Sequence, residues 1–425
     1  MINERGLYKY YIVLLAVLCT WVSTVSAPPL PIRLAYLTAL IAPAFLSAPK
    51  LLVPVLVCFT SIASYGFSCS YMPTELYFYL GIMAVLLLLS LDKLYNTQRP
   101  PTILSIFCIY VIVIDYIAGA KLVNIDYSLL IILSSFFFVS KYGYEKEAYI
   151  ICFVLVSIVL CIYYFTYGQS GIEVMEDGRV GWVDSNYMGN VCGMGVVLAY
   201  HVFINKMFAA KKLFSNTCLF TVVAGVIMLI LNASRGAFLS MSIAVIVITL
   251  FAKIPLKKKI VIACIAVLFI VCVYNLGLFE VLEERVNSDD GTGNSRTIIW
   301  GKKMEAFSHL PFLQRLFGLG YKGGFDLAIP GGFGFHNDYL AFIVDYGYVG
   351  FILFIALMFY PITIVGCKSS NRPIVISLVL FLLTCSFTLE PFTAGRLTYW
   401  YFYMLIILFA RWSQYDKYIN EKIIH

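Results

Sequence analysis

The chain has 425 residues, of which 61% are hydrophobic and only 12% are charged. Soluble proteins carry about 25% charged residues, so the composition excludes a soluble globular domain. The formal net charge of +7 comes from basic loops. The densest basic cluster, Lys257–Lys259, is typical of a solvated cytoplasmic loop rather than of phosphate binding. The sequence therefore predicts an all-α polytopic membrane protein with no nucleic-acid partner.

Apolar runs long enough to form membrane helices recur along most of the chain. The first follows Arg5 and Lys9 and is interpreted as an uncleaved helix. The second and third are short and contain Pro43, Pro49 and Pro54, so we expect about 12–14 transmembrane helices. The expected spans lie near residues 8–26, 30–48, 51–67, 75–91, 102–120, 125–140, 148–167, 186–205, 216–233, 236–252, 260–279, 348–366, 373–389 and 398–412.

Lysine and arginine predict the orientation of these spans. Basic loops near Lys211, Lys253–Lys259 and Lys368–Arg372, together with the basic C-terminal tail, are expected to face the cytoplasm. Because successive spans cross the membrane in opposite directions, these cytoplasmic loops place both termini in the cytoplasm. It also places four polar stretches on the outer side, which are residues 168–185, 233–235, 280–337 and 390–397.

Three regions are expected along the chain. Residues 1–279 form a transmembrane helix bundle of about eleven spans, with an outer loop near 168–185. Residues 280–337 form one large outer loop, and residues 338–425 form the C-terminal transmembrane helices and a cytoplasmic tail. Ordering a loop as long as 280–337 costs entropy that lipid contacts do not offset. We therefore expect the chemistry of the protein to lie in this loop.

Within this loop, the segment before Trp300 predicts the start of a helix. Asn294 or Ser295 serves as the cap, and Arg296 and Trp300 share one face, one turn apart. Two interpretations stay open here. The helix is either an interfacial helix anchored by Trp300, or it places Arg296 beside helix N–H groups as an anion site.

Arginines at outer membrane edges require an explanation, because the positive-inside bias acts against them. Arg235 stands in a tight turn between two spans, where it either snorkels to lipid headgroups or grips a phosphate with its planar fork. Arg179 precedes Asp184 and Asn186 at the mouth of another span, where Asp184 also suits a helix cap. Arg396 lies in the last outer stretch.

His336 and Asn337 end a glycine-rich stretch at the point where the chain returns to the membrane. An imidazole there titrates near neutrality and can accept a proton from a hydroxyl group, whereas an isolated interfacial histidine is usually inert. Asp115, Asp345 and Glu390 are further carboxylates at expected membrane edges. No metal, nucleotide or serine-nucleophile motif is present, so we expect no metal and no cofactor.

These residues carry a resemblance to a family. The sequence resembles the O-antigen polymerase and O-antigen ligase superfamily of bacterial envelope glycosyltransferases. In the ligase pattern, a histidine and a small polar residue are followed, after nine residues, by Gly-x-x-Gly. His336, Asn337, Gly347 and Gly350 meet this pattern.

Three upstream elements extend the resemblance. Arg296–Trp300 is similar to the family's Arg-x-x-x-Trp element, and Ser234–Gly236 to its Ser-Arg-Gly turn. Asp184–Asn186 resembles an Asp-Pro-Asn element in which Ser185 replaces the proline. The motifs cover residues 180–352, and the earlier spans match in hydropathy alone.

The resemblance implies a C-type glycosyltransferase-like fold with one large periplasmic loop, in a multi-pass protein of the bacterial inner membrane with both termini cytoplasmic. The donor would be an oligosaccharide linked to undecaprenyl diphosphate, used at the periplasmic face and without a metal. Arg235 and Arg296 would bind the diphosphate leaving group, and His336 would act on the acceptor hydroxyl. Further substrate contacts are expected from Arg179, Asp184, Asn186, Trp300, Asn337 and Arg396.

Three functions stay open. The Gly-Asn-Ser-Arg-x-x-x-Trp form and the Asp-Ser-Asn element favour a polymerase of lipid-linked repeat units. Its partners would be membrane lipid, a chain-length regulator and a flippase. The alternative is an O-antigen ligase that transfers the glycan to lipid A-core. A second alternative is a flippase or transporter of lipid-linked oligosaccharide, which would be expected to show repeat symmetry and charges within several spans.

Overall fold

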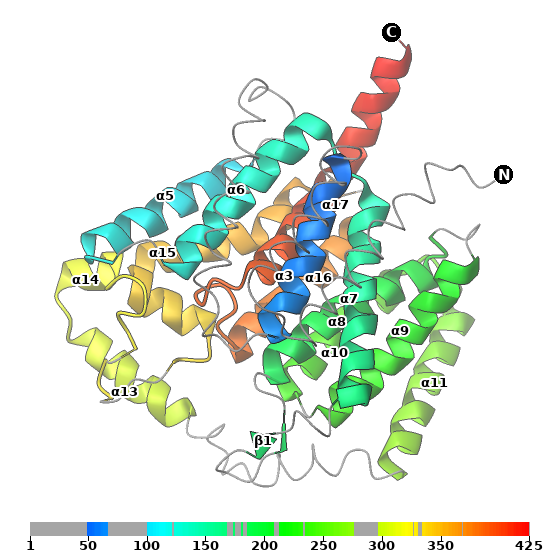
Figure 1. Ribbon diagram of the computed structural model, residues 1–425, viewed down its shortest axis with the longest axis horizontal. Coiled ribbons are helices and arrows are strands. Elements are labelled where there is room, and N and C mark those ends of the chain that lie inside the picture. Colours follow the sequence, from blue (N-terminus) through cyan, green and yellow to red (C-terminus); the bar gives the residue numbers. More distant parts are fainter. Residues whose placement is uncertain are drawn as a thin grey trace, which may run out of the picture. The chain divides into compact units, whose positions relative to one another are not determined.

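The computed structural model describes residues 49–66, 100–120, 123–167, 173–174, 180–181, 185–207, 212–232, 234–275, 296–325, 327–329, 334–367 and 369–424. The chain divides into two compact units (Figure 1). Unit 1 comprises Met1–Thr74 and Tyr142–Val286, and unit 2 comprises Glu75–Lys141 and Asn287–His425.

Unit 1 is a bundle of apolar helices in which α8 is the central element. Its helices are α3 (Leu52–Gly66), preceded by the short η1 (Pro49–Leu51), α7 (Lys146–Tyr167), α8 (Ser185–Ile204), α9 (Lys212–Leu231), α10 (Arg235–Phe251) and α11 (Leu256–Asn275). Helix α8 packs against α7, α9 and α10. Gly189 and Gly195 permit this approach, because an added Cβ would meet Ser234 and Ser157 respectively. Two-residue strands, β1 (Glu173–Val174) and β2 (Val180–Gly181), form an antiparallel pair.

Unit 2 is built around α15. Its elements are α5 (Thr102–Ile117), α6 (Asn124–Tyr142), α13 (Arg296–Ser308), α14 (Phe312–Phe317), α15 (Asp338–Ile364), α16 (Arg372–Thr388) and α17 (Leu397–Ile424). Helix α15 packs against α5, α14, α16 and α17. A cluster of aromatic rings fills the space between these helices. It includes Phe342 stacked on Phe354 with centroids 4.2 Å apart, and Phe392 against Trp400 at 4.8 Å.

A kink in α15 opens its backbone to the preceding loop. Gly347 has φ +66° and ψ −176°, which are not helical values. The carbonyls of Val344 and Asp345 accept from the N–H groups of Leu319 and Gly320, at 3.1 and 2.7 Å. The Tyr346 carbonyl accepts from the Tyr110 hydroxyl at 2.7 Å. The loop after α14 is thereby hydrogen-bonded to α15 just before its kink.

The structure confirms the all-α polytopic architecture. Four described helices are long and apolar enough to cross a membrane (α6, residues 186–204 of α8, α9 and α15), and α5, α10 and α16 are shorter apolar helices. The expected spans near 8–26, 30–48 and 75–91 lie outside the described residues, so the predicted helix count stays a prediction.

The apolar run expected to span the membrane at 348–366 corresponds to the part of α15 after its kink at Gly347. The helix itself begins at Asp338, the residue at which the C-terminal region was expected to begin. The buried aspartates Asp338 and Asp345 interrupt the apolar run in the sequence, although hydrogen bonds satisfy both carboxylates in the fold. Hydropathy alone therefore missed the first turns of the helix.

We predict that Gly347→Ala destabilises the protein. A left-handed φ at a residue with a side chain costs about 1–3 kcal/mol, and a Cβ here would overlap the backbone of Leu316 and Gly318. Gly301→Ala is the matched control. Gly301 is exposed in α13 with nothing within 4 Å of an added Cβ, so alanine should be neutral or stabilise by about 0.5–1 kcal/mol. Thermal unfolding in detergent, followed by tryptophan fluorescence, measures both. Equal shifts for the two variants would refute the role of the kink.

Candidate functional site

The chain segment before α15 turns sharply at His336. This residue has φ +49°, in the left-handed region, and it is exposed. Asn337, which is 2% exposed, caps α15, and its Oδ1 accepts from the backbone N–H of Leu340 at 3.2 Å. The prediction that His336 lies between the loop and the helix is confirmed. The side-chain oxygen of Asn337 is used in the helix cap. A contact between Asn337 and substrate stays a prediction.

Asp338 ties a second loop to the same helix end. Its buried carboxylate accepts from the backbone N–H groups of Phe392 (3.3 Å) and Thr393 (2.9 Å), and from the Thr393 hydroxyl (2.8 Å). The Asp338 N–H donates to the carbonyl of Leu389 at 3.0 Å. The loop between α16 and α17 is therefore held against the beginning of α15.

Asp345 holds a third segment two turns further along α15. Its carboxylate accepts from the N–H groups of Lys322 at 3.1 Å and Gly324 at 2.9 Å. From α13, the fully buried Lys303 donates to the carbonyls of Gly324 and Phe325 at 2.5 and 2.8 Å. The 321–325 turn is thus fixed on both its N–H and carbonyl sides.

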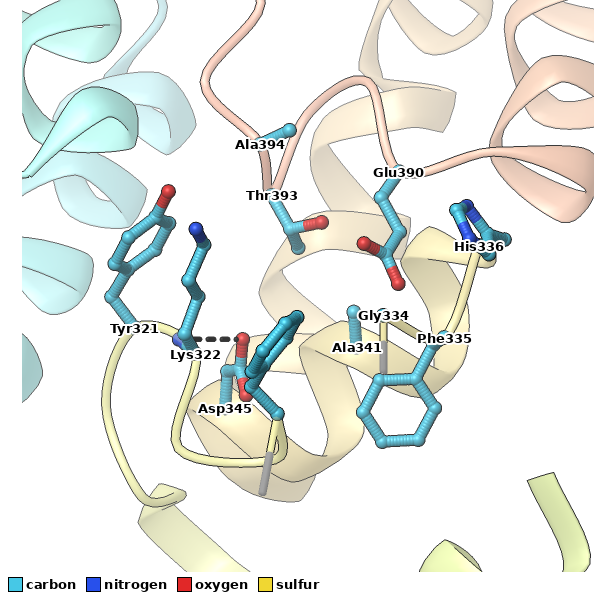
Figure 2. A pocket seen from close by; sticks show the side chains of 11 residues that line it. Tyr321, Lys322, Gly334, Phe335, His336, Ala341, Asp345, Glu390, Thr393 and Ala394 are labelled. Carbon is cyan, nitrogen blue, oxygen red and sulfur yellow. Dashed lines mark hydrogen bonds between the residues drawn. The ribbon is translucent and has the colours of Figure 1, made fainter. Parts of the chain in front are cut away.

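The three segments enclose a cavity of about 370 Å³. Figure 2 shows Tyr321 and Lys322 on one side, with Glu390 and Thr393 across from them and His336 beyond Glu390. The lining residues are Tyr321, Lys322, Phe325, Gly334, Phe335, His336, Ala341, Asp345, Glu390, Thr393 and Ala394. Burial, followed by the charges of Asp345, Asp115 and Glu390, raises the pKa of Tyr321 to about 12. Its phenol is therefore a neutral hydrogen-bonding group in this cavity.

Glu390 is the carboxylate nearest to the His336 turn. An added Cβ on Gly334 would lie 3.1 Å from its Oε2. Burial raises the pKa of this carboxyl, whereas the N–H groups of His336, Phe335 and Asn337 and the charge of Lys303 lower it. These amides face the carboxylate, but Oε1 is buried and receives no hydrogen bond within the described part of the chain.

Arg296 and Trp300 lie close to the His336 turn, since the Arg296 charge acts on the imidazole and Trp300 contacts the residue before it. Arg296 Nη1 donates to the Thr388 carbonyl at 3.1 Å. Trp300 Nε1 donates to the Phe335 carbonyl at 2.6 Å, and its ring packs against Phe387. Helix α13 begins at Arg296, as expected, whereas the predicted caps Asn294 and Ser295 lie outside the described residues.

The pKa of the His336 imidazole is lowered from its ordinary value. Burial by the surrounding protein is the larger cause, although the residue is partly exposed to solvent, and the positive charge of Arg296 lowers the pKa further. A neutral imidazole can accept a proton or a hydrogen bond, whereas an imidazolium cannot. Arg396 lies in the loop that carries Glu390 and is half-buried, and its charge acts on Tyr321.

The remaining predicted residues belong to unit 1. Asn186 is in the first turn of α8, and its Oδ1 accepts from the Ser234 hydroxyl at 3.2 Å. Arg235 begins α10 directly after Ser234. The two predicted elements therefore meet within unit 1. Arg179 and Asp184 lie outside the described residues.

Sequence reasoning missed three contributors to the site. Asp338 was not singled out, although its spacing of seven residues from Asp345 places both on one helix face. Lys303 looks like an ordinary surface lysine of an amphipathic helix, and no sequence signal indicated its burial. Glu390 was recognised only as a carboxylate at a membrane edge. Within the described part of the chain, no group of three or more His, Cys, Asp or Glu side chains could hold a metal, and metal independence stays a prediction.

Comparison with known proteins identifies one family. A family model described as O-antigen ligase matches residues 220–355, a segment that contains Arg235, Arg296 and His336. The match supports the resemblance to the O-antigen polymerase and ligase superfamily and, with the apolar helices, a membrane protein of surface polysaccharide synthesis. No curated protein matches the chain.

We predict that His336 titrates below 6.5, the ordinary histidine pKa, and that Arg296→Ala raises its pKa by removing a neighbouring positive charge. Diethyl pyrocarbonate reacts with the neutral imidazole. Its rate of reaction at His336, followed by peptide mass spectrometry between pH 5 and 8, therefore gives the midpoint. The exposed His309 is modified in the same samples and serves as an internal control for the activity of the reagent. A midpoint above 6.5, or one that Arg296→Ala leaves in place, would contradict the assignment.

Proposed function

We propose that this chain, in which residues 220–355 carry the O-antigen ligase family match, is a glycosyltransferase that uses an oligosaccharide linked to undecaprenyl diphosphate. It would act as a polymerase that joins repeat units at the periplasmic face of the bacterial inner membrane. The main support is that two residues of the matched segment lie together: His336 lines a cavity, and the charge of Arg296 lowers the pKa of its imidazole. The positions of basic loops in the sequence support cytoplasmic termini and a periplasmic site.

The chemistry follows from the charges in the reaction. The acceptor oxygen forms a bond to the anomeric carbon of the donor, and the bond from that carbon to the diphosphate breaks. The electron pair leaves with the diphosphate, whose growing negative charge a fixed guanidinium stabilises. Arg296 is the proposed guanidinium group. The family resemblance implies the same role for Arg235, which stays a prediction.

His336 would receive the hydroxyl proton of the acceptor or position that hydroxyl. The lowered pKa of its imidazole suits this role, because a protonated ring could not accept the hydrogen bond. Arginine supplies here the positive charge that a divalent metal supplies in other glycosyl transfers, so the proposed reaction needs no metal.

A ligase is the second candidate, and the description of the matched family favours it. The two functions share the donor and differ in the acceptor. A polymerase uses the terminal sugar of another lipid-linked repeat, whereas a ligase uses the outer-core sugar of lipid A-core. The Asp-Ser-Asn and Gly-Asn-Ser-Arg elements of the sequence favour the polymerase.

We predict that His336→Ala and Arg296→Ala each reduce chain extension by roughly 10²–10³-fold, the usual loss for a general base or a charge-stabilising donor. Polysaccharide ladders on gels measure the extension, and membrane fractionation checks insertion. His309→Ala and Lys302→Ala remove exposed groups of the same types and should leave the ladders unchanged. Normal ladders from either site variant would disprove the assignment. Transport of the lipid-linked oligosaccharide across the membrane by the protein, with no change in chain length in the His336 variant, would favour a transporter.

A deletion strain separates polymerase from ligase. Loss of a polymerase leaves lipid A-core that carries one repeat unit, because a separate ligase still transfers it. Loss of a ligase leaves core without repeat units, and polymer accumulates on undecaprenyl diphosphate. We expect the first phenotype. Analysis of the core by gel and mass spectrometry provides the measurement, and bare core would establish the ligase.

A further inference from the structure

The cavity beside His336 differs in chemistry from an anion-binding site. Its lining includes two carboxylates, Asp345 and Glu390, and one lysine, Lys322. No arginine of the described part of the chain lines it. A diphosphate carries several negative charges and would be repelled by such a lining, whereas a neutral ligand would not.

The two carboxylates of the cavity differ in their hydrogen bonding. Both oxygens of Asp345 already accept backbone N–H groups of the 321–325 turn. Glu390 instead has a buried Oε1 without a hydrogen-bond donor in the part of the chain that the structure describes. A buried acceptor left in this state is costly. The Glu390 side chain lines the cavity and its carboxylate points into the space between the segments in Figure 2, so it is placed to accept a hydrogen bond from a ligand hydroxyl group.

Aromatic groups also line the cavity. Tyr321 lies across from Glu390 in Figure 2, and Phe325 belongs to the same turn. The Lys322 ammonium lies 5.4 and 5.7 Å from their ring centroids. The phenol of Tyr321 remains neutral because its pKa is raised to about 12. Aromatic rings opposite hydrogen-bonding groups give an amphipathic site, which suits a ring that has both C–H faces and hydroxyl groups.

We propose that this cavity is the subsite for the acceptor sugar, an uncharged carbohydrate ring, and that Glu390 orients it by accepting a hydrogen bond from one of its hydroxyl groups. The proposal rests on the proposed transferase function and specifies one part of that site. The acceptor would enter beside His336, whose ring lies beyond Glu390 in Figure 2. Arg296 would hold the donor diphosphate outside the cavity.

The test uses two probes on the full-length protein in detergent. One is the repeat-unit oligosaccharide released from its lipid by mild acid, and the other is inorganic pyrophosphate. Saturation-transfer NMR measures oligosaccharide binding, and isothermal calorimetry measures pyrophosphate binding. Glu390→Gln keeps the size of the side chain but replaces a charged acceptor with an amide. It should weaken oligosaccharide binding about tenfold or more, as expected for loss of a hydrogen bond to a charged group.

The same substitution should not weaken pyrophosphate binding. Glu305→Gln is the matched control, because Glu305 is an exposed residue of α13 and its substitution removes the same charge outside the cavity. Unchanged oligosaccharide affinity in Glu390→Gln would overturn the proposal. So would pyrophosphate affinity that rises at least tenfold in Glu390→Gln and not in Glu305→Gln, because the cavity would then be an anion site.

Phe325→Leu provides a second variant if Glu390→Gln does not fold. It keeps an apolar side chain, removes the aromatic face and should weaken oligosaccharide binding several-fold; full affinity would also overturn the proposal. Steady-state kinetics of chain extension separates the two levels of inference. Wild-type protein without transferase activity refutes the proposed function. Active wild type, with an acceptor KM that Glu390→Gln leaves unchanged, refutes the acceptor subsite alone.

Discussion

The hydrogen bonds of two buried aspartates on α15 determine the shape of the candidate site. Burying a carboxylate is expensive unless backbone or side-chain donors satisfy it. Asp338 and Asp345 meet this requirement with N–H groups of two different loops, residues 392–393 and residues 322–324. The loops therefore cannot leave the helix without exposing unsatisfied charge, and the cavity walls are fixed to one rigid element.

The same reasoning applies to Glu390, one oxygen of which has no hydrogen-bond donor in the described part of the chain. Lys303 is fully buried, its ammonium donates to the carbonyls of Gly324 and Phe325, and its positive charge lowers the pKa of the Glu390 carboxyl. Native structures leave few buried polar atoms without partners, and those few often have a functional reason. Glu390 has such an atom at the wall of a cavity, next to the His336 turn, which is where a hydroxyl-bearing ligand is required.

Local features of the sequence predicted much of the fold but only part of the site. Hydropathy located eleven of the described helices. Helix-capping logic placed Arg296 at the start of a helix, and the end of a glycine-rich stretch placed His336 before another. The apolar run of α15 begins only after the kink at Gly347 because hydropathy counts Asp338 and Asp345 as polar, whereas in the fold both carboxylates accept hydrogen bonds from backbone donors. Contacts between segments far apart in the sequence bring Arg296 close to His336 and bury Lys303. Residue spacing within a single helix cannot predict such contacts.

The arrangement around His336 separates two opposing electrostatic requirements of glycosyl transfer. In the proposed reaction a leaving diphosphate needs positive charge, which Arg296 would provide outside the cavity. An acceptor hydroxyl needs a hydrogen-bond acceptor that orients it, which Glu390 would provide inside the cavity. Placing the guanidinium and the carboxylate in one undivided pocket would pair them with each other and cancel both effects. The left-handed turn at His336, with its backbone amides facing Glu390 and its imidazole under the influence of Arg296, lets one short segment contact both environments.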